Sequence, residues 1–537
     1  MAARTVAERL RFLPAGSECI LVELEDLETT LTLLDGLLAS RPEGVTDIVP
    51  AARTVMIRFD PFATTRKRVA AAVGQIDLSM RRVRQGDTFE IPVKYDGEDL
   101  ADVAEYLGWT VEEVIRRHTE ATFTVAFTGF APGFAYMTCD DPGFDVPRRK
   151  SPRVRIPAGS VALAGRFGGI YPSDSPGGWQ LLGTTPLRMW DTTRERAALL
   201  APGDRVRFHE VTDNSTLSRV QRPPPQEQAA PRSGGLFVTR ADRPALYQDL
   251  GRPGRADQGV SEAGALDRRA LREANLCVGN APEAAAVEIT FGGFAVKTDR
   301  AVTVAVSGAR GPLTIRTAAG RQIDAPFGHP FALDPGDELA IGPPSEGMRS
   351  YVALRGGFAV APVLGSASTD TLAKIGPEPI VAGQVLPGAN LPTGAVDPGR
   401  PKLQPLPRAS DTVTLDVVLG PRADWFTPEG INTLLAQDWQ VTAESSRIGM
   451  RLAGVVPLER SVAAELPSEG TATGSIQVPH SGQPVVFLAD HPLTGGYPVI
   501  GVIASYHLDL AGQIPIGARI RFKQVAVVDP QTEETDR

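Results

Sequence analysis

A short glycine-rich element occurs twice in this chain, once in each half, and it restricts the possible architecture more than any other pattern. Residues 173–184 read SDSPGGWQLLGT and residues 493–502 read LTGGYPVIGV, so each has a glycine pair, an aromatic residue and an apolar run. A Gly-Ser-apolar step precedes each element, at Gly159 and at Gly474. Glycine pairs let a backbone turn sharply and let a ligand approach main-chain N–H groups. The repetition predicts two related β domains, each presenting a glycine bend beside an aromatic wall.

Length and composition describe a globular protein of several domains. A chain of 537 residues exceeds one hydrophobic core and predicts three or more domains. The 54 glycines and 46 prolines, with few aromatic residues, favour many short strands joined by tight turns. A formal net charge of −8 argues against a nucleic-acid-binding surface, which needs a basic stripe.

Metal, disulfide and membrane signals are missing. Three widely spaced cysteines without a CxxC pair do not predict a disulfide framework or a structural zinc, and the six scattered histidines predict no metal site. No apolar run reaches about 18 residues, so we expect no transmembrane helix and no membrane partner. The first residues have no secretory apolar region, so the expected compartment is the cytoplasm.

The first 212 residues divide into two parts. Residues 1–88 alternate strand and helix signals and predict a small ferredoxin-like α+β domain. Its expected elements are strands at 18–24, 46–59 (broken at Pro50) and near 82–92, with helices at 26–40 and 61–73. Residues 89–212 predict a β module that also holds short helices at 100–107 and 110–118. Thr110 and Glu113 match a capping box at the start of the second helix.

A proline-rich stretch at 213–235 is the clearest linker, and strands dominate after it. We expect two further β modules, at 236–395 and 396–528, one helix at 265–278, and a disordered tail at 529–537. Similar Pro-Gly turns precede a closing strand in residues 199–208, 331–341 and 512–522, and they favour three related β modules.

Two stretches of the first half carry candidate binding residues. FTGFAPGFAYM (127–137) interleaves aromatic residues such as Phe130 with glycines, which is typical of a small pocket lining, although a turn packed in the core has the same pattern. Ser173, Asp174 and Ser175 lie beside the first glycine pair. A carboxylate and hydroxyls near exposed N–H groups can bind a small polar amide or carboxylate. An ordinary irregular hairpin is the alternative.

Two stretches of the second half carry the remaining candidates. In residues 246–293, the arginines of the expected helix favour a solvated face, whereas Glu288 among apolar neighbours predicts a buried, functional carboxylate. In residues 468–502, Asp490 and His491 place a carboxylate beside a group that titrates near neutrality, which suits acid–base chemistry. His491 alone is more typical of a structural histidine. The chain has no P-loop, HExxH or GxSxG motif, and no Met-Lys site for biotin.

These stretches resemble the paired allophanate-hydrolase subunit 1 and subunit 2 family. Its members include 5-oxoprolinase subunits B and C, the KipI and KipA regulators, and the carboxyltransferase part of urea carboxylase. GFAPGFAYM and PAGSVALAG with YPSDSPGGWQLLG resemble the first partner. QDLGRPG, GALDRRAL, SSRIGMRL, GSIQVP and LTGGYP resemble the second. The resemblance covers about residues 15–525, and the two partners are fused here through the proline linker.

The resemblance implies a chain that is mainly β with an α+β N-terminal part. It implies cyclophilin-like β-barrels, one in the first half and two in the second. It also implies a component of an ATP-dependent 5-oxoprolinase that opens 5-oxo-L-proline to L-glutamate with a LamB/YcsF-type subunit. We expect that partner to bind or share the ATP, and we leave open assembly into a homo-oligomer. The candidate catalytic residues are Asp490, His491 and Glu469. The candidate substrate-binding residues are Gly177, Gly178, Trp179, Ser175, Phe130, Gln477, Thr494, Gly495, Gly496 and Tyr497.

Two other functions stay open. One is biotin-dependent carboxyl transfer to urea or a similar amide, with the biotin on a separate carrier because this chain lacks an attachment site. The other is inhibition of a histidine kinase by the first half and relief by the second, as in KipI and KipA. Permanent fusion of an inhibitor to its antagonist argues against that regulatory role.

Overall fold

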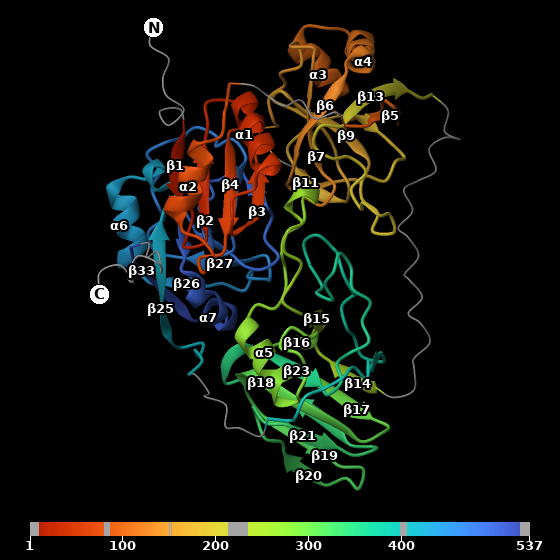
Figure 1. Cartoon of the computed structure of the whole chain (residues 1–537), viewed down its shortest axis with the longest axis vertical. Helices are drawn as coiled ribbons and strands as arrows, with labels where there is room; N and C mark the ends of the chain where they lie inside the picture. The colour runs from red at the N-terminus through yellow and green to blue at the C-terminus, as the bar shows by residue number, and fades with distance from the viewer. Residues whose placement is uncertain are drawn as a thin grey trace.

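A computed structural model describes residues 10–79, 86–149, 151, 153–212, 235–397 and 405–526 of the chain. Figure 1 shows the N-terminal domain beside the last barrel, the first barrel at one end of the molecule, and the middle module at the other end. Residues 213–234 of the predicted linker and the predicted tail lie outside the described residues. In the described part, no helix combines the length and the apolar character needed to cross a bilayer.

The N-terminal domain is a four-stranded antiparallel sheet with two helices, in the order β1-β2-β4-β3. Its elements are β1 (Arg11–Pro14), β2 (Cys19–Glu23), α1 (Leu27–Ala39), β3 (Val45–Pro50), β4 (Thr54–Phe59) and α2 (Arg66–Gly74). They confirm the predicted alternation of strands and helices. The strand expected near 82–92 does not complete this sheet. Its described part, β5 (Thr88–Val93), joins the next sheet, because β1 already pairs with the free edge of β2.

The first barrel is a seven-stranded sheet in the order β12-β9-β10-β7-β6-β13-β5. Its elements are β5, α3 (Leu100–Leu107), α4 (Val111–Glu120), β6 (Phe123–Thr128), β7 (Ala135–Cys139), β8 (Arg153–Ile156), β9 (Ser160–Ala164), β10 (Phe167–Ile170), β11 (Ser175–Gly177), β12 (Gln180–Thr184) and β13 (Arg205–Glu210). Backbone hydrogen bonds between Lys94 and Thr184 bring the two ends of the sheet together. Thr110 accepts the N–H of Glu113 at 3.2 Å, which confirms the predicted cap of α4.

The last barrel is closed, in the order β25-β32-β29-β30-β27-β26-β33. Its elements are β25 (Thr412–Leu419), η3 (Ala423–Trp425), α6 (Pro428–Ala436), β26 (Trp439–Val441), β27 (Gly449–Ala453), β28 (Glu469–Gly470), β29 (Ser475–Gln477), β30 (Val485–Phe487), β31 (Thr494–Gly495), β32 (Val499–Ile503), η4 (Ser505–His507), α7 (Leu508–Gln513) and β33 (Arg519–Gln524). Read from β5 and from β25, the two barrels have the same strand order, and in each the first strand pairs in parallel with the last. This shared topology confirms the duplication that the glycine elements predict.

The middle module is built from a six-stranded and a five-stranded sheet around one hydrophobic core. Its elements are β14 (Gly235–Ala241), β15 (Leu246–Gln248), η2 (Ala256–Gln258), α5 (Arg268–Cys277), β16 (Ala286–Thr290), β17 (Phe294–Thr298), β18 (Val302–Arg310), β19 (Leu313–Arg316), β20 (Gln322–Asp324), β21 (Phe331–Leu333), β22 (Glu338–Ile341), β23 (Glu346–Leu354) and β24 (Val385–Pro387). The Pro-Gly turn within residues 331–341 leads into β22, which lies inside its sheet between β17 and β19. The turns before β13 and β33 therefore occupy equivalent places, and the turn before β22 does not.

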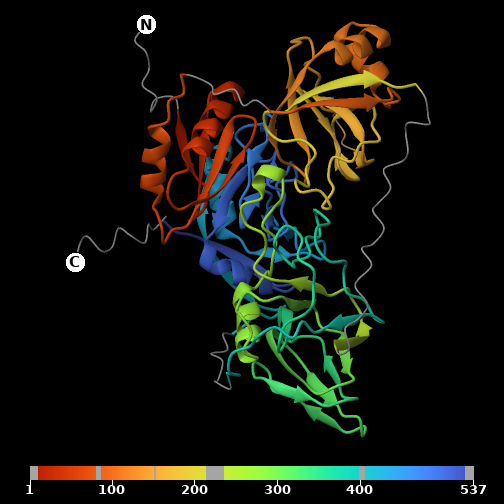
Figure 2. The same ribbon diagram turned by 45° about the vertical axis from the view of Figure 1, so that its right-hand side comes forward.

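Loops of the middle module reach both barrels, as Figures 1 and 2 show. The loop that carries η2 contacts the first barrel, where Gly133 donates its N–H to the carbonyl of Gln258 at 3.0 Å. The loop 363–376 contacts the last barrel, where Thr371 donates to Asp490 at 2.7 Å. The middle module therefore holds the two barrels next to each other.

Candidate functional site

The two glycine bends occupy equivalent places in the two barrels. The first bend leads from β11 through Gly178 and Trp179 into β12, and the second leads from β31 through Gly496 and Tyr497 into β32. β11 and β31 each belong to a small two-stranded sheet outside the barrel, with β8 and β28 respectively. The repeated sequence element is thus one structural device used twice.

A single tyrosine connects the two bends. The ring of Tyr136 lies 5.5 Å from the ring of Trp179 at the first bend. The same Tyr136 ring and the side chain of Thr494, which begins the second bend, both lie against Gly129, at 3.6 and 3.0 Å from the position that its Cβ atom would occupy. Thr494 also accepts the N–H of Phe130 at 3.0 Å. The candidate residues of the two halves therefore lie together at the junction between the barrels.

The first bend is filled by aromatic side chains. Trp179 is only 6% exposed and packs edge-to-face on Phe134 with ring centroids 5.2 Å apart. A Cβ atom at Gly177 would lie 2.3 Å from the Tyr171 hydroxyl, so only glycine fits there. Ser175 donates to the carbonyl of Ser173 at 3.1 Å, which keeps the bend tight. The first bend is a packed wall.

Phe130 sits in a strained turn at this junction. Its φ of 63° is in the left-handed region, which a bulky side chain rarely adopts. A Cβ atom at Gly129 would lie 3.0 Å from the hydroxyl of Thr494, so the turn fits closely against the last barrel. Such conformations persist only where the surroundings enforce them, and they concentrate at functional sites. Phe127 and Phe134 are fully buried, so the stretch 127–137 contributes both to the core and to the junction.

The second bend is more open. Gln477 donates to the carbonyl of Tyr497 at 3.2 Å and lies against Gly495, which fixes the turn. Tyr497 is 39% exposed, and its ring stacks edge-to-face on His480 with centroids 5.5 Å apart. Within the described residues, the N–H groups of Gly496 and Tyr497 have no hydrogen-bond acceptor. These two N–H groups are available to a ligand.

Asp490 and His491 do not form the acid–base pair that their adjacency predicts. The Asp490 carboxylate accepts from the Arg447 guanidinium, with both distances 3.0 Å, and from Thr371. The Nδ1 atom of His491 lies 2.8 Å from the carbonyl of Pro492. Burial lowers the pKa of His491 to about 4, so the ring is neutral at pH 7. The two side chains face different partners because Asp490 and His491 lie in a tight turn, in which His491 donates its N–H to the carbonyl of Leu488 at 3.3 Å.

Asp490 belongs to a buried ionic network between the last barrel and the middle module. Arg447 also pairs with Glu288, which accepts from the Tyr351 hydroxyl at 2.8 Å. Burial raises the pKa of Glu288, but the charges of Arg447 and Arg349, with the hydrogen bonds from Tyr351 and Arg447, together outweigh it, and the pKa lies below its usual value. Burial and the charge of Asp490 raise the pKa of Asp370 to about 6. The predicted burial of Glu288 is confirmed. Its pairing with Arg447 places it at the interface between the middle module and the last barrel.

The backbone of Glu469 contacts the second bend, whereas its side chain contacts a different interface. Its backbone pairs with Gly495 at the second bend. Its buried carboxylate accepts from Arg422 at 2.9 Å, and Arg422 also pairs with Glu23 of the N-terminal domain at 2.8 Å. Burial raises the pKa of Glu469 above its usual value against the opposing effect of Arg422. Its side chain therefore joins two domains.

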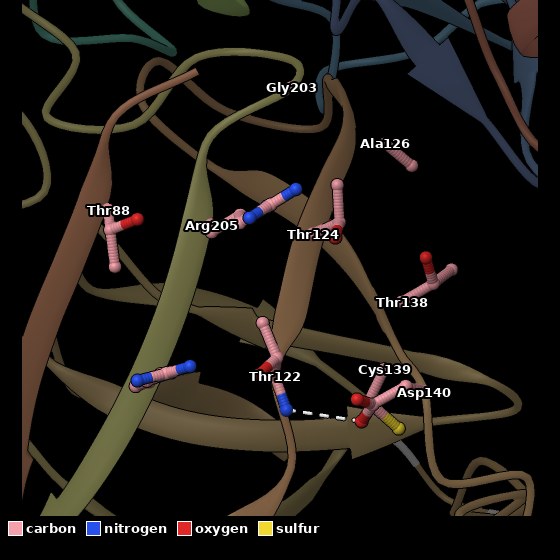
Figure 3. Close-up of a pocket in the computed structure, with 10 residues that line it drawn as sticks. Thr88, Thr122, Thr124, Ala126, Thr138, Cys139, Asp140, Gly203 and Arg205 are labelled. Atoms are coloured by element: carbon pink, nitrogen blue, oxygen red, sulfur yellow. Dashed lines mark hydrogen bonds between the residues drawn. The ribbon is translucent and has the colours of Figure 1, made fainter. Parts of the chain in front are cut away.

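Two cavities contain none of the predicted site residues. The first, about 550 Å³, lies on the outer face of the first barrel (Figure 3). It is lined by Thr88, Thr122, Thr124, Ala126, Thr138, Cys139, Asp140, Gly203, Arg205 and Arg207. The second, about 400 Å³, lies between α5 and α7 and includes Asp267, whose pKa burial raises to about 7. Sequence reasoning missed both cavities. The threonine and arginine alternation that lines the first is also typical of an ordinary solvent face. The lining of the second comes from segments far apart in the sequence, from Asp267 to Gln513.

Comparison with known proteins agrees with this architecture. Residues 10–200 match the carboxyltransferase domain, subdomain C and D, and residues 258–524 match the carboxyltransferase domain, subdomain A and B. The chain is 35% identical over 303 residues to the C-type subunit of 5-oxoprolinase from Escherichia coli (strain K12), an alignment that spans 56% of this chain and 95% of that protein. It belongs to the carboxyltransferase-domain family.

The other half of the family pair is also represented. Over 122 residues, which are 22% of this chain and 56% of the relative, the chain is 45% identical to the B-type subunit of 5-oxoprolinase from Escherichia coli O157:H7. The crystal structure of TTHA0988 superposes with a TM-score of 0.81 at 35% identity, covering 94% of this chain and 99% of that one. Both halves of this carboxyltransferase-family chain therefore have their counterparts in a single solved chain.

Proposed function

We propose that this chain is a component of 5-oxoprolinase that opens the ring amide of 5-oxo-L-proline to give L-glutamate. The observation that carries the proposal is the junction at which Phe130 and Tyr136 of the first half meet Thr494 of the second. There, the half similar to the B-type 5-oxoprolinase subunits and the half similar to the C-type subunits bring their glycine bends together. A site that needs both halves is expected of an enzyme whose relatives carry these halves as two different subunits.

The second bend supplies the electrostatic part of this chemistry. A lactam is a stable amide, so its opening requires stabilisation of the negative charge that develops on the carbonyl oxygen. One well-placed N–H donor contributes roughly 10²–10³-fold to such a reaction. The N–H groups of Gly496 and Tyr497 are the donors in this proposal, and the exposed ring of Tyr497 covers the lactam ring. Trp179 does not contact the lactam in this proposal, and it packs against the ring of Tyr136 instead.

The catalytic roles that the sequence suggests for Asp490, His491 and Glu469 stay predictions, and their contacts support a different role. Asp490 and Glu469 are each paired with an arginine in a buried joint. His491 is buried and neutral. In our proposal these residues are positioning residues that hold the second bend, while the group that delivers or removes the proton comes from elsewhere in the complex.

We infer that ATP is bound or shared by a third subunit of the LamB/YcsF type. The chain has no P-loop sequence, so its own residues offer no standard cradle for the phosphates. The test mixes the purified full chain with that subunit, ATP and 5-oxo-L-proline. We expect glutamate and ADP to form only when both proteins are present. Failure of the folded mixture to release glutamate contradicts the proposal.

A second candidate is carboxyl transfer to urea or a similar amide, favoured by the carboxyltransferase description that matches both halves. It requires a separate biotinylated carrier and its carboxylase. The discriminating assay supplies those proteins with bicarbonate, ATP and urea, and measures carboxylated product. Product formation there, without glutamate from 5-oxo-L-proline, favours this candidate over the first.

A further inference from the structure

The geometry points to Arg148 as the residue that binds the carboxylate of the substrate, with Arg460 as a second cation at the same bend. This inference rests on the proposed function, because it assigns a binding group to each of the two polar groups of the proposed substrate. The N–H groups of Gly496 and Tyr497 take the lactam carbonyl, and the guanidinium groups take the carboxylate. The site therefore selects a small lactam acid over a neutral amide.

Arg148 lies between the two bends although it belongs to the first barrel. Its Nη1 atom is 3.9 Å from the position that a Cβ atom of Gly496 would occupy. The next residue, Arg149, donates its N–H to the carbonyl of Gly178 at 2.8 Å. The backbone of this segment is therefore fixed at the first bend, and the side chain of Arg148 reaches the second.

Arg148 differs from the other arginines of its basic segment in having no carboxylate. Arg149 and Arg153 both pair with the buried Asp99, and Arg155 pairs with Asp174 at 2.7 Å. Among the described residues, no carboxylate oxygen lies within 4.0 Å of the Arg148 guanidinium. Its positive charge is therefore available at the place where the two halves meet.

Arg460 provides a second uncompensated guanidinium. Its Cζ atom lies 5.9 Å from the centroid of the Tyr497 ring, and one amino group donates to the carbonyl of Val478. Its buried Nε atom has no acceptor among the described residues. Burial lowers the pKa of Arg460, which is the effect expected of a cation without a counter-ion.

Two guanidinium groups beside two free N–H groups match an anionic ligand of small size. Arginine binds carboxylates in a planar, two-bonded geometry, and this charge-assisted pairing is stronger than a neutral hydrogen bond. In 5-oxo-L-proline the carboxylate and the lactam carbonyl flank the same ring nitrogen, so one bend can contact both. Urea and 2-pyrrolidinone have no carboxylate and leave Arg148 unpaired.

The binding test uses isothermal titration calorimetry on the full chain with 5-oxo-L-proline and with 2-pyrrolidinone. Arg148→Gln weakens binding of 5-oxo-L-proline at least about tenfold, as expected for loss of a charge-assisted hydrogen bond. It leaves binding of 2-pyrrolidinone unchanged. The matched control is Arg207→Gln, an exposed arginine on the outer face of the same barrel. Equal affinity of Arg148→Gln and the wild-type chain for 5-oxo-L-proline overturns the inference.

Arg460→Gln is the second variant, and thermal unfolding of each protein shows that a loss of binding is not a loss of fold. Failure of the wild-type chain to bind 5-oxo-L-proline, alone and with the third subunit, also overturns the inference.

Kinetics with the third subunit separate this inference from the proposed function. We expect Arg148→Gln to raise KM for 5-oxo-L-proline with little change in kcat, because the carboxylate lies away from the reacting carbonyl. Turnover with an unchanged KM in Arg148→Gln rejects the role of Arg148 and leaves the function standing. Absence of turnover in the wild-type complex, with Arg148-dependent binding of lactam acids retained, rejects the function and leaves the anion site standing.

Discussion

Arg447 pairs with carboxylates of two different modules, Asp490 of the last barrel and Glu288 of the middle module. All three side chains are buried, so each charge depends on its partners. Removing one member of a buried ion pair leaves an uncompensated charge in a poorly solvated place. The residues that the sequence marks as chemically interesting are therefore also the ones on which the joint between modules depends.

We predict that Asp490→Asn lowers the free energy of unfolding by about 3–5 kcal/mol, because it leaves Arg447 short of a counter-charge. The matched control is Asp438→Asn, which breaks the exposed pair of Asp438 with Arg521 and costs about 0–1 kcal/mol. Guanidinium chloride unfolding measures both. A cost for Asp490→Asn as small as that of the control contradicts the assignment of Asp490 to the joint.

His118 on α4 gives the first barrel a pH-dependent stability. Burial lowers its pKa to about 3, so below pH 6.5 the unfolded chain binds a proton that the folded chain does not. This contribution to stability falls as the pH drops from about 7 toward 4, by about 2 kcal/mol at pH 5. We predict that His118→Phe, which keeps a ring beside Phe208, flattens the pH dependence of unfolding between pH 7.5 and 5.

The control for this prediction is His209→Gln, because His209 is exposed on β13 of the same barrel. It should keep the wild-type slope of unfolding free energy against pH. Identical slopes in the wild-type chain and His118→Phe contradict the prediction.

The positions of single site residues were predictable only where the sequence repeats, and their roles stay predictions. The duplicated bends identified Gly177, Gly496 and their neighbours, and the structure brings them together. The partners of Asp490 were not predictable, because Thr371 lies 119 residues away and Arg447 lies in another segment. The unpaired state of Arg148 was hidden for a related reason. Its segment contains several arginines, and only the fold decides which of them meets an acid.

Strand β12 closes the first barrel through a glycine. A Cβ atom at Gly183 would lie 2.2 Å from the carbonyl oxygen of Lys94, at the end of β5. The equivalent Gly501 on β32 has Val417 of β25 at 2.7 Å. Both glycines therefore allow the first strand of each barrel to approach the strand that follows the bend.

We predict that Gly183→Ala lowers the free energy of unfolding by about 1–3 kcal/mol, because the new methyl group meets backbone that cannot move away. Gly74→Ala is the control, since nothing lies within 4 Å of its Cβ position at the end of α2. Alanine there stabilises a helix by up to about 1 kcal/mol. Opposite shifts in the urea midpoint are expected, and shifts of the same sign contradict the role of Gly183 in closure.

Elements were predictable where a local signal decides them. The capping threonine of α4 and the alternation of α1, β3, β4 and α2 follow from residues close in sequence. The edge of the N-terminal sheet was not predictable, because β1 and β5 compete for it and only tertiary pairing selects β1. The same limit applies to β22, whose preceding turn resembles those of β13 and β33.

The two halves of the chain are held together by direct contacts as well as by the segment that joins them. Glu23 of the N-terminal domain pairs with Arg422 of the last barrel, and Arg11 pairs with Asp424 at 2.7 Å. Arg58 pairs with Glu262 of the middle module. These pairs add to the contacts around Thr494, so the halves form one continuous body.

We predict that cutting the chain at a protease site inserted within 213–234 leaves the halves associated. Size-exclusion chromatography of the cleaved protein should show one peak at the volume of the uncut chain, containing both fragments. High salt should weaken the complex only partly, because Arg422 in its pair with Glu23 is buried and the contact between Phe130 and Thr494 involves no charge. Separation of the fragments at low salt contradicts the prediction.

Duplication of the barrel has a consequence for how the site evolved. Two copies of a module begin with two equal copies of every surface, yet here the copies have diverged. Trp179 is buried in the interior, whereas Tyr497 is exposed to solvent at the corresponding position. The first bend therefore contributes to the packed interior, and the second bend is accessible to a ligand. Two unequal bends can orient an asymmetric molecule, which two identical bends facing each other could not.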